Sequence, residues 1–470
     1  MVSETARDWA VAEFGTARMK DDRWRRRLVS MGAQVARRPG GTVSEVFNDA
    51  AARQGAYGLL ESGGVSRQEI AEAMFAGGAR RCAEFPFVFA PVDGSSVSLT
   101  DVRRTKGFGS VGNHAHGARG LKVMSALLVS PSGVPLGLGS QVWWTRTGAP
   151  KKKNHKKRPT EEKETQRWLE AAEQTRETMG ANAPETRLWF QLDREGDAWP
   201  IILNLGKAPE WFTVRGNHNR NVTLADGSRI RLQTLLGRQR IACTYPLSVS
   251  AGPGRSERTA TMTVRGCEVT LAFRNELTGE RFSKTLNVVL AQEEGTTPAG
   301  EKPIRWLLLT NRQISTVEEL KQVLLGYAQR WKIELFHRTW KSGACEVEQM
   351  QLRSVEAAEK WATVLAAVAI KIERIKQLSR TEPLRPATDE FTPVELRAIA
   401  LVRFGEKAPQ HCPKGTVPTI EQAVRWLAEI GGYTGKSSGG PPGSMTISRG
   451  LREVLTVARV LALTAKGSGL

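Results

Sequence analysis

The chain has 470 residues, of which 40% are hydrophobic, so roughly two to four domains with their own cores are expected. Its 68 Lys and Arg residues outnumber 48 Asp and Glu residues and give a net charge of +20, which favours a polyanion as partner. Nucleic acid is the first candidate and an anionic membrane surface the second, although no run of about eighteen apolar residues exists to span a bilayer.

The start of the chain and its cysteines are typical of a cytoplasmic protein. Residues 1–5 lack a charged segment followed by an apolar core, so no secretory signal is expected. The five cysteines lie far apart, without the paired spacing of a zinc site or a disulfide framework, and are expected to be reduced thiols. They are Cys82, Cys243, Cys267, Cys345 and Cys412.

Residues 1–72 are expected to form a small helical domain. Within residues 22–37 a basic run precedes apolar residues at helical spacing, a pattern that suits contact with DNA phosphates. The alternative is an ordinary helical subdomain with a solvated basic face. Pro39 ends this helix, and capping boxes at Thr42 and Ser66 are expected to open a second and a third helix. The candidate DNA-contacting residues of the run are Arg25, Arg26 and Arg27.

From residue 85 the periodicity changes to that of strands. A buried strand at residues 87–90 is expected to end near Asp93, and two further apolar runs, at 121–129 and 134–144, should form a hairpin. The basic segment 146–158 is either a solvated loop or a segment that follows a phosphate backbone. A helix should follow at 160–179 and end at Gly180.

A second strand, at residues 187–192, delivers Asp193 just past its end. The acids that follow, Glu195 and Asp197, either support a site or belong to a polar loop. A short helix at 198–205 and a strand at 211–215 come next, and residues 216–303 have the composition of a mainly β insertion. The run at 304–310, which contains Trp306, is expected to be a last buried strand.

One continuous helix is expected from the capping box at Thr316 to Lys341, with a weak point at Gly326. At 100° per residue, five of its side chains fall within roughly 80° of one another. This face is either a surface ladder of ion pairs or a carboxylate that holds a metal while its neighbours hold phosphates. The side chains are Tyr327, Arg330, Glu334, Arg338 and Lys341.

The C-terminal part is expected to be helical. A long apolar-faced helix at 354–378 is followed by prolines, and shorter helices are predicted at 392–404 and 419–430. A Ser, Gly and Pro-rich linker at 437–443 precedes a final helix at 448–463.

Two strand ends and one helix can bring Asp93, Asp193 and Glu334 to one edge of a mixed sheet. Three hard oxygen ligands suit Mg²⁺ or Mn²⁺, and two such ions would activate an attacking oxygen and stabilise a leaving one. Arg330, Arg338 and Lys341 would then hold a phosphodiester backbone, and Arg330 can do so with two parallel hydrogen bonds.

The spacing of Tyr327, Arg330, Glu334 and Lys341 resembles the Tyr-Arg-Glu-Lys signature of the insertion-sequence-four family of DDE transposases. The resemblance extends over nearly the full length of the chain. It implies an α/β RNase H-like catalytic core at residues 73–378 with a β-rich insertion at about 216–303. A helical domain at 1–72 would read transposon ends, and helices at 379–470 would pair subunits and contact DNA. Supporting stretches are Gln54-Gly55-Ala56-Tyr57, Gln141-Val142-Trp143-Trp144, Asp193-Arg194-Glu195 and Trp306-Leu307-Leu308-Leu309-Thr310.

The resemblance also implies roles for single residues. Asp93, Asp193 and Glu334 would form the metal-binding catalytic triad, while Tyr327, Arg330 and Lys341 would grip the DNA end. Trp306 would stack on a flipped base, the alternative being a buried strand tryptophan, and Arg215 matches a basic strand-end residue near the active site. The chain departs from the family at Leu121-Lys122, where the relatives have an aromatic pair.

The implied activity is that of a cut-and-paste DNA transposase, which performs metal-dependent strand cleavage, hairpin formation and strand transfer. The expected partners are the double-stranded DNA of transposon ends and target, and a second copy of the chain in a synaptic complex, with no membrane. A bacterial, nucleoid-associated location in the cytoplasm is expected. The alternatives are a catalytically silent DNA-binding repressor and an RNase H-like nuclease without transfer activity.

Overall fold

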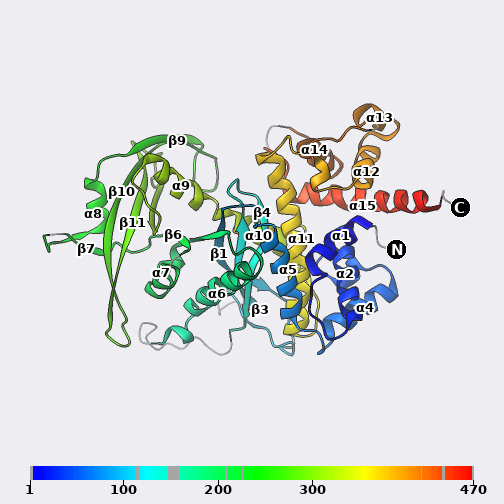
Figure 1. The fold of residues 1–470 in the computed structure, drawn as a ribbon, viewed down its shortest axis with the longest axis horizontal. Coiled ribbons are helices and arrows are strands. Elements are labelled where there is room, and N and C mark those ends of the chain that lie inside the picture. The colour runs from blue at the N-terminus through cyan, green and yellow to red at the C-terminus, as the bar shows by residue number, and fades with distance from the viewer. Residues whose placement is uncertain are drawn as a thin grey trace.

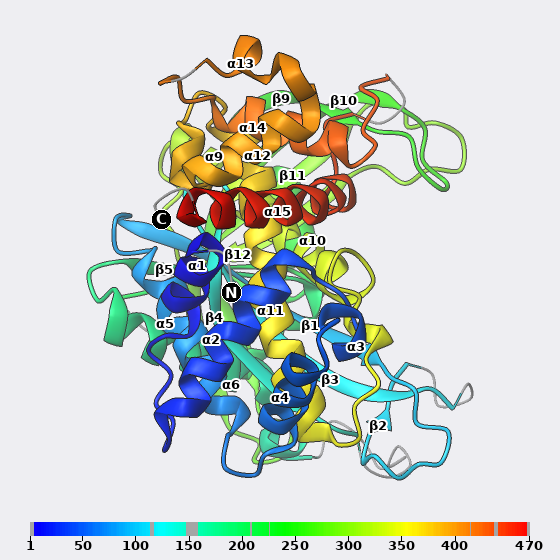
Figure 2. The same cartoon turned by 90° about the vertical axis from the view of Figure 1, so that its right-hand side faces the viewer.

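The computed structural model describes residues 4–112, 117–146, 158–206, 209–224, 226–413, 415–436 and 440–467. Most of the basic segment 146–158 and part of the linker 437–443 lie outside the described residues. The described part is a mixed α/β structure with one large sheet and helices at both ends of the chain (Figures 1 and 2).

The sheet has a parallel centre with antiparallel strands on both sides. Strands β1, β5 and β6 are parallel, β3 pairs antiparallel with β1, and β12 pairs antiparallel with β6. The order is β2-β3-β1-β5-β6-β12-β11-β10-β7-β8, with β4 on β3 and β9 on β10. The strands of the central part of the sheet are β1 Phe87–Ser98, β2 Gly109–Ser110, β3 Arg119–Val129, β4 Pro135–Trp144, β5 Arg187–Leu192, β6 Trp211–Arg215 and β12 Arg305–Thr310.

Strand β1 does not end at the acid, so the predicted strand was too short. Its parallel pairing with β5 stops at Val92, opposite Leu192, but its antiparallel pairing with β3 continues as far as Ser98. Asp93 therefore lies inside a strand, at the point where one of its two neighbours ends. The predicted hairpin of β3 and β4 is confirmed.

Residues 216–303, predicted to be mainly β, do form mostly strands, and these strands belong to the same sheet as the rest. The two longest strands, β10 and β11, continue the central sheet beyond β12 and form the long hairpin at the left of Figure 1. The elements are β7 Asn221–Thr223, β8 Arg229–Arg231, α8 Leu232–Arg238, β9 Cys243–Val249, β10 Arg258–Arg274 and β11 Arg281–Glu294.

Helix α6 (Thr165–Asn182) packs on β3 and β4, on one face of the sheet, and α7 (Trp199–Leu205) follows β5. The prediction that Gly180 ends the helix was wrong, since α6 runs two residues further. Pro184, which cannot continue a helix, follows just after the last residue.

The opposite face carries α9 (Val317–Ala328), α10 (Trp331–Lys341) and α11 (Val355–Thr381). The predicted continuous helix is interrupted at Gln329 and Arg330, not at Gly326. Hydrogen bonds three residues apart tighten the chain there, from Arg330 N to Tyr327 O (3.0 Å) and from Lys332 N to Gln329 O (3.0 Å).

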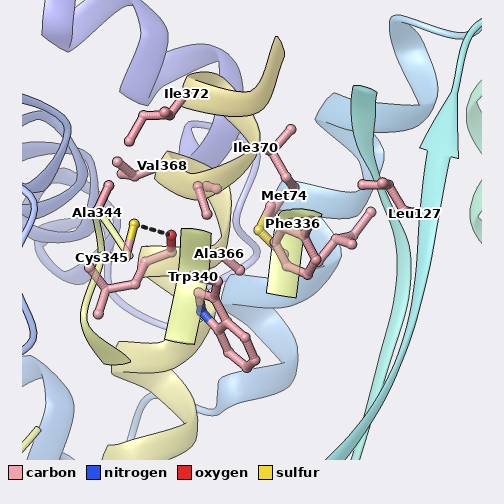
Figure 3. Packing of buried hydrophobic residues seen from close by; sticks show 14 of the residues in the cluster. Met74, Leu127, Phe336, Trp340, Ala344, Cys345, Ala366, Val368, Ile370 and Ile372 are labelled. Atoms are coloured by element: carbon pink, nitrogen blue, oxygen red, sulfur yellow. Dashed lines mark hydrogen bonds between the residues drawn. The ribbon is translucent and has the colours of Figure 1, made fainter. Parts of the chain in front are cut away.

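Aromatic packing holds α10 between α11 and the sheet. Phe336 and Trp340 are fully buried, and their rings stack with centroids 5.8 Å apart. Trp340 Nε1 donates to Ala362 O on α11 at 2.9 Å, and Phe336 lies near Leu127 of β3 and Met74 (Figure 3). The buried side of α10 is therefore fixed, and its other side is left for Glu334 and the cations.

The N-terminal helices are α1 Glu4–Phe14, α2 Asp22–Arg37, α3 Val43–Val46, α4 Ala50–Glu61 and α5 Arg67–Arg80. The helix predicted to open at Thr42 is only the four-residue α3, because the chain leaves it at Phe47 and starts α4 with a new cap at Asp49. The capping box at Ser66 is confirmed. The predicted domain boundary at residue 72 falls within α5.

The C-terminal helices are α12 Pro393–Phe404, α13 Ala408–His411, α14 Ile420–Ile430 and α15 Ser444–Gly467. Helix α11, at whose end the boundary near residue 378 was predicted, contacts α2, α4, α5, α10, α14 and α15. It runs between the sheet and helices α1, α2 and α4 (Figure 1). Within the ranges described above, no helix is both long and apolar enough to cross a membrane.

We predict that Gly326→Ala destabilises the protein by about 1–3 kcal/mol, because a new methyl group would be overpacked. A Cβ on Gly326 would lie 2.8 Å from Cε1 of Phe89 in β1. Gly180→Ala on α6 is the matched control, since a Cβ there meets nothing within 4 Å. It should stabilise by about 0.5–1 kcal/mol through helix propensity. Denaturant unfolding measures both, and equal effects of the two substitutions would contradict the close approach of α9 to β1.

Candidate functional site

Two acids lie at the same edge of the sheet because β1 and β5 are parallel. Asp93 follows the last residue of β1 that pairs with β5, and Asp193 follows the last residue of β5. The carboxylate of Asp193 also caps the turn after β5, since its Oδ1 accepts from Glu195 N at 2.8 Å. The sequence therefore places both carboxylates where two parallel strands end their pairing.

Helix α10 brings Glu334 to this edge, and Arg330 joins the two elements. Arg330 Nη1 lies 3.8 Å from Oδ2 of Asp93, and Arg330 Nη2 forms an ion pair with Oε1 of Glu334. The side chain of Arg330 is only 14% exposed, so water screens these pairs weakly. One guanidinium thus bridges a strand carboxylate and a helix carboxylate.

The electrostatics of Asp93 show that the acids interact. Burial raises the pKa of Asp93 to about 7, and the negative charges of Asp193 and Glu334 act in the same direction against the opposing charge of Arg330. The carboxylate of Asp93 is therefore costly to keep charged, and an added cation would favour its charged form.

The donor chemistry at this edge fits a hard divalent cation such as Mg²⁺ or Mn²⁺, which prefers carboxylate oxygens. The side chains are not gathered around a common point, however. Among the described residues, no group of three or more His, Cys, Asp or Glu side chains is arranged to hold a metal ion. The space between Asp93 and Glu334 is instead bridged by Arg330.

The phenol of Tyr327 links Arg330 to a second part of the site. Burial raises the pKa of Tyr327, while the neighbouring charges of Arg330 and Arg215 oppose this shift. The ring of Trp306 meets that of Tyr327 edge to face, with centroids 5.2 Å apart. The guanidinium of Arg215 is fixed by a hydrogen bond to β12, since its Nη2 donates to Arg305 O at 3.1 Å. The predicted residues of β6, β12 and α9 are thus brought together.

The two cations further along α10 differ in their surroundings. Arg338 is exposed, whereas Lys341 Nζ lies 3.6 Å from Oε1 of Glu348. The same oxygen accepts from Ser98 N at 2.9 Å, near the end of β1. Glu348 is not among the predicted site residues, because a single Glu in a turn carries no sequence signal.

Asp197 is a second residue that the sequence did not distinguish from a polar loop. Its carboxylate is buried, pairs with Nη2 of Arg220 at 2.7 Å, and accepts from Asn217 N at 2.6 Å and His218 N at 3.1 Å. It ties the turn that carries Asp193 to the loop that follows Arg215. Glu195, by contrast, is exposed.

The two residues of the departure at Leu121-Lys122 lie on opposite faces of the sheet, Leu121 in the core that also holds Phe336 and Trp340 of α10, and Lys122 on the face that carries α6. Leu121 is fully buried, and Lys122 lies 3.8 Å from Glu164 and 5.6 Å from the ring of Trp144. Since Glu164 precedes α6, Lys122 faces away from α10.

The basic run lies on α2, apart from the carboxylates. Arg25 and Arg26 both pair with Asp22, and Arg26 Nε lies 3.2 Å from it. Arg27 packs over Gly55 of α4, where a Cβ would lie 1.8 Å from its Nη1. Gly55 belongs to the stretch Gln54-Gly55-Ala56-Tyr57, so this glycine leaves room for an arginine of the run.

The N-terminal helices match a known protein family. Residues 6–65, from α1 to just beyond α4, match the family described as transposase DNA-binding. This supports a DNA-binding role for the N-terminal helices, with DNA as partner, and it supports a transposase.

We predict that Arg25→Gln weakens duplex binding and lowers the slope of log affinity against log salt by about one, because one phosphate contact is lost. Asp22→Asn should strengthen binding about twofold to fivefold, since it releases Arg25 and Arg26 together. Fluorescence anisotropy over a salt series measures both effects. Arg238→Gln on α8 is the control, because Arg238 is also exposed and lies in a part of the chain to which no DNA contact is assigned. Binding that is unaffected by both α2 changes would contradict this role.

Proposed function

We propose that a chain with this DNA-binding domain is a cut-and-paste DNA transposase of the insertion-sequence-four family. The observation that carries the proposal is the meeting of Asp93, Glu334 and Arg330, with Asp193 close enough to shift the pKa of Asp93. A nuclease site needs carboxylates for metal and cations for phosphate, and this edge has both.

The core is proposed to be RNase H-like. The sheet order β4-β3-β1-β5-β6, with β3 as the antiparallel strand beside β1 and helices on both faces, supports this assignment. Beyond β6 lie β12 and the strands of the insertion, which extend the sheet without separating β1 from β5.

Asp93, Asp193 and Glu334 would hold two ions of Mg²⁺ or Mn²⁺. Bound there, the ions would supply an activated water and stabilise the leaving oxygen at a phosphodiester. The residues of the chain itself bind and orient the DNA. Arg330 immediately before α10, and Arg338 and Lys341 within it, form a row of cations that suits a phosphate backbone. The phenol of Tyr327 keeps Arg330 at the carboxylate edge.

Trp306 is proposed to stack on a base that leaves the duplex during hairpin formation. Its ring is only partly buried, in contrast to the fully buried ring of Trp340, and it makes an edge-to-face contact with the ring of Tyr327. Arg215 lies beside the same phenol, where its charge would meet the phosphate next to that base.

The proposed partners are the duplexes of transposon ends and target and a second copy of the chain. Helices α1–α4 would hold the end, and the helices of residues 379–470 would pair subunits in the synaptic complex. The proposed location is the bacterial cytoplasm, with the nucleoid. The second candidate is a catalytically silent DNA-binding repressor, which is favoured by one observation: Arg330 already pairs with Glu334 and lies close to Asp93.

We predict that Glu334→Gln abolishes Mg²⁺-dependent cleavage of the element's terminal DNA and leaves binding of that DNA intact. The substitution keeps the size of the side chain but removes a charged ligand. Gel analysis of nicks and hairpins, with anisotropy for binding, measures both. Glu318→Gln, at an exposed position in the first turn of α9, serves as the control. Cleavage that persists in the Glu334 variant would refute the carboxylate assignment, and no cleavage in the unchanged protein would favour the repressor.

We predict that Trp306→Ala slows hairpin formation about tenfold to a hundredfold, because a stacked base contributes about 1–3 kcal/mol. First-strand nicking should change much less. Time courses that resolve nicked and hairpin products separate the steps. Trp199→Ala, which removes a partly buried tryptophan stacked on Phe282, controls for general destabilisation. Equal slowing of both steps in the Trp306 variant would rule out base stacking.

A further inference from the structure

The guanidinium of Arg330 already bridges the carboxylates proposed to bind metal. Its Nη1 lies 3.8 Å from Asp93, and its Nη2 pairs with Glu334. Asp93 and Glu334 come from different elements, β1 and α10, and one positive charge lies close to both. An ion coordinated by both carboxylates would have to compete with that charge.

The backbone places Arg330 in this position. Arg330 precedes the first residue of α10, with a helical conformation (φ −52°, ψ −36°). From there its side chain reaches along the first turn to Glu334, four residues later. Tyr327, one turn earlier, lies on its other side. The tight turn between α9 and α10 therefore aims Arg330 at the carboxylates.

Arg330 cannot leave this site by losing its proton, because a guanidinium stays charged at any pH a protein tolerates. It can only exchange partners. A phosphodiester is a suitable alternative, since it accepts two parallel hydrogen bonds from arginine as a carboxylate does. Arg338 and Lys341 lie further along α10 and would draw such a backbone toward Arg330.

We propose that Arg330 is an exchangeable counter-ion that couples DNA binding to metal binding. Without DNA it occupies Asp93 and Glu334 and weakens their affinity for a divalent ion. With DNA it moves to a phosphate, and both carboxylates become available. By thermodynamic reciprocity, metal binding then strengthens DNA binding by the same factor. This inference rests on the proposed function, and it restricts a fully loaded cleavage site to the DNA-bound protein.

The test is Mn²⁺ affinity, measured from the electron paramagnetic resonance signal of free Mn²⁺. The full chain is titrated alone and with a duplex recovered from a random library by its binding to this protein. The unchanged protein should bind Mn²⁺ about tenfold more tightly with the duplex. Arg330→Gln should bind Mn²⁺ that tightly without DNA, and the duplex should add nothing. Mn²⁺ affinity that is insensitive to DNA in the unchanged protein, or weakened by Arg330→Gln, overturns the proposal.

A charge-conserving substitution and a remote one test whether the charge of Arg330 itself competes with the ion. Arg330→Lys keeps the positive charge and should keep the weak Mn²⁺ affinity of the DNA-free protein, so binding as tight as in Arg330→Gln would overturn the charge competition. Arg265→Gln removes an arginine that is 16% exposed and lies 3.3 Å from Glu294, and it should behave as the unchanged protein does. A gain in Mn²⁺ affinity there would likewise overturn the proposal.

Asp93→Asn separates this inference from the proposed function. If it leaves Mn²⁺ binding intact with and without DNA, the proposed metal site is wrong, and the coupling with it. If it removes Mn²⁺ binding, but DNA does not change Mn²⁺ affinity in the unchanged protein, the metal site stands and only the coupling is wrong. Loss of binding in Asp93→Asn together with a DNA-dependent gain in the unchanged protein supports both.

Discussion

The burial of α11 is the constraint on which the arrangement of the chain depends. A helix that is apolar on nearly all sides must be covered on all sides, and α11 is covered by N-terminal helices, C-terminal helices, α10 and β4. Its buried polar groups join these parts. Trp361 Nε1 donates to Gly41 O at 2.7 Å, and Lys360 Nζ donates to Ser62 O at 2.8 Å. Because a buried lysine without partners would be costly, these bonds fix where the N-terminal helices lie.

The same helix sets the position of α10, and with it the charges at the sheet edge. Glu373 of α11 accepts hydrogen bonds from Thr339 of α10 and from Ser444 of α15. One side of α10 therefore packs against α11, and the side that carries Glu334 faces β1. Like charges gathered there would repel one another, and Arg330 is the group that offsets them in the DNA-free chain. The distribution of charge at the edge thus follows from how α10 is packed.

Several local features followed from the residues alone. The strands that lead to Asp93 and Asp193, the hairpin of β3 and β4 and the helix of the basic run could be predicted, because strand and helix periodicities are local properties of the chain. The order of these elements also indicated that two acids could share one edge. The break at Gln329 and Arg330 was not predicted, since neither residue is a helix breaker. The role of Gly326 was misread, because its lack of a side chain matters through its packing against Phe89 and Gln191, which are remote in sequence.

Sequence by itself determined which chemical groups are present and near which elements they lie: carboxylates in or just after strands, cations along one helix, and a basic run on another. It could not determine which partner each charge meets. Arg330 beside Asp93, and Asp197 against the loop after β6, both depend on distances between segments that are separated in sequence. Such pairs form only once the hydrophobic core has fixed the elements in space, since an ion pair is too weak to bring two elements together by itself. Tertiary structure therefore decided how the charges are paired, whereas the sequence decided what they are.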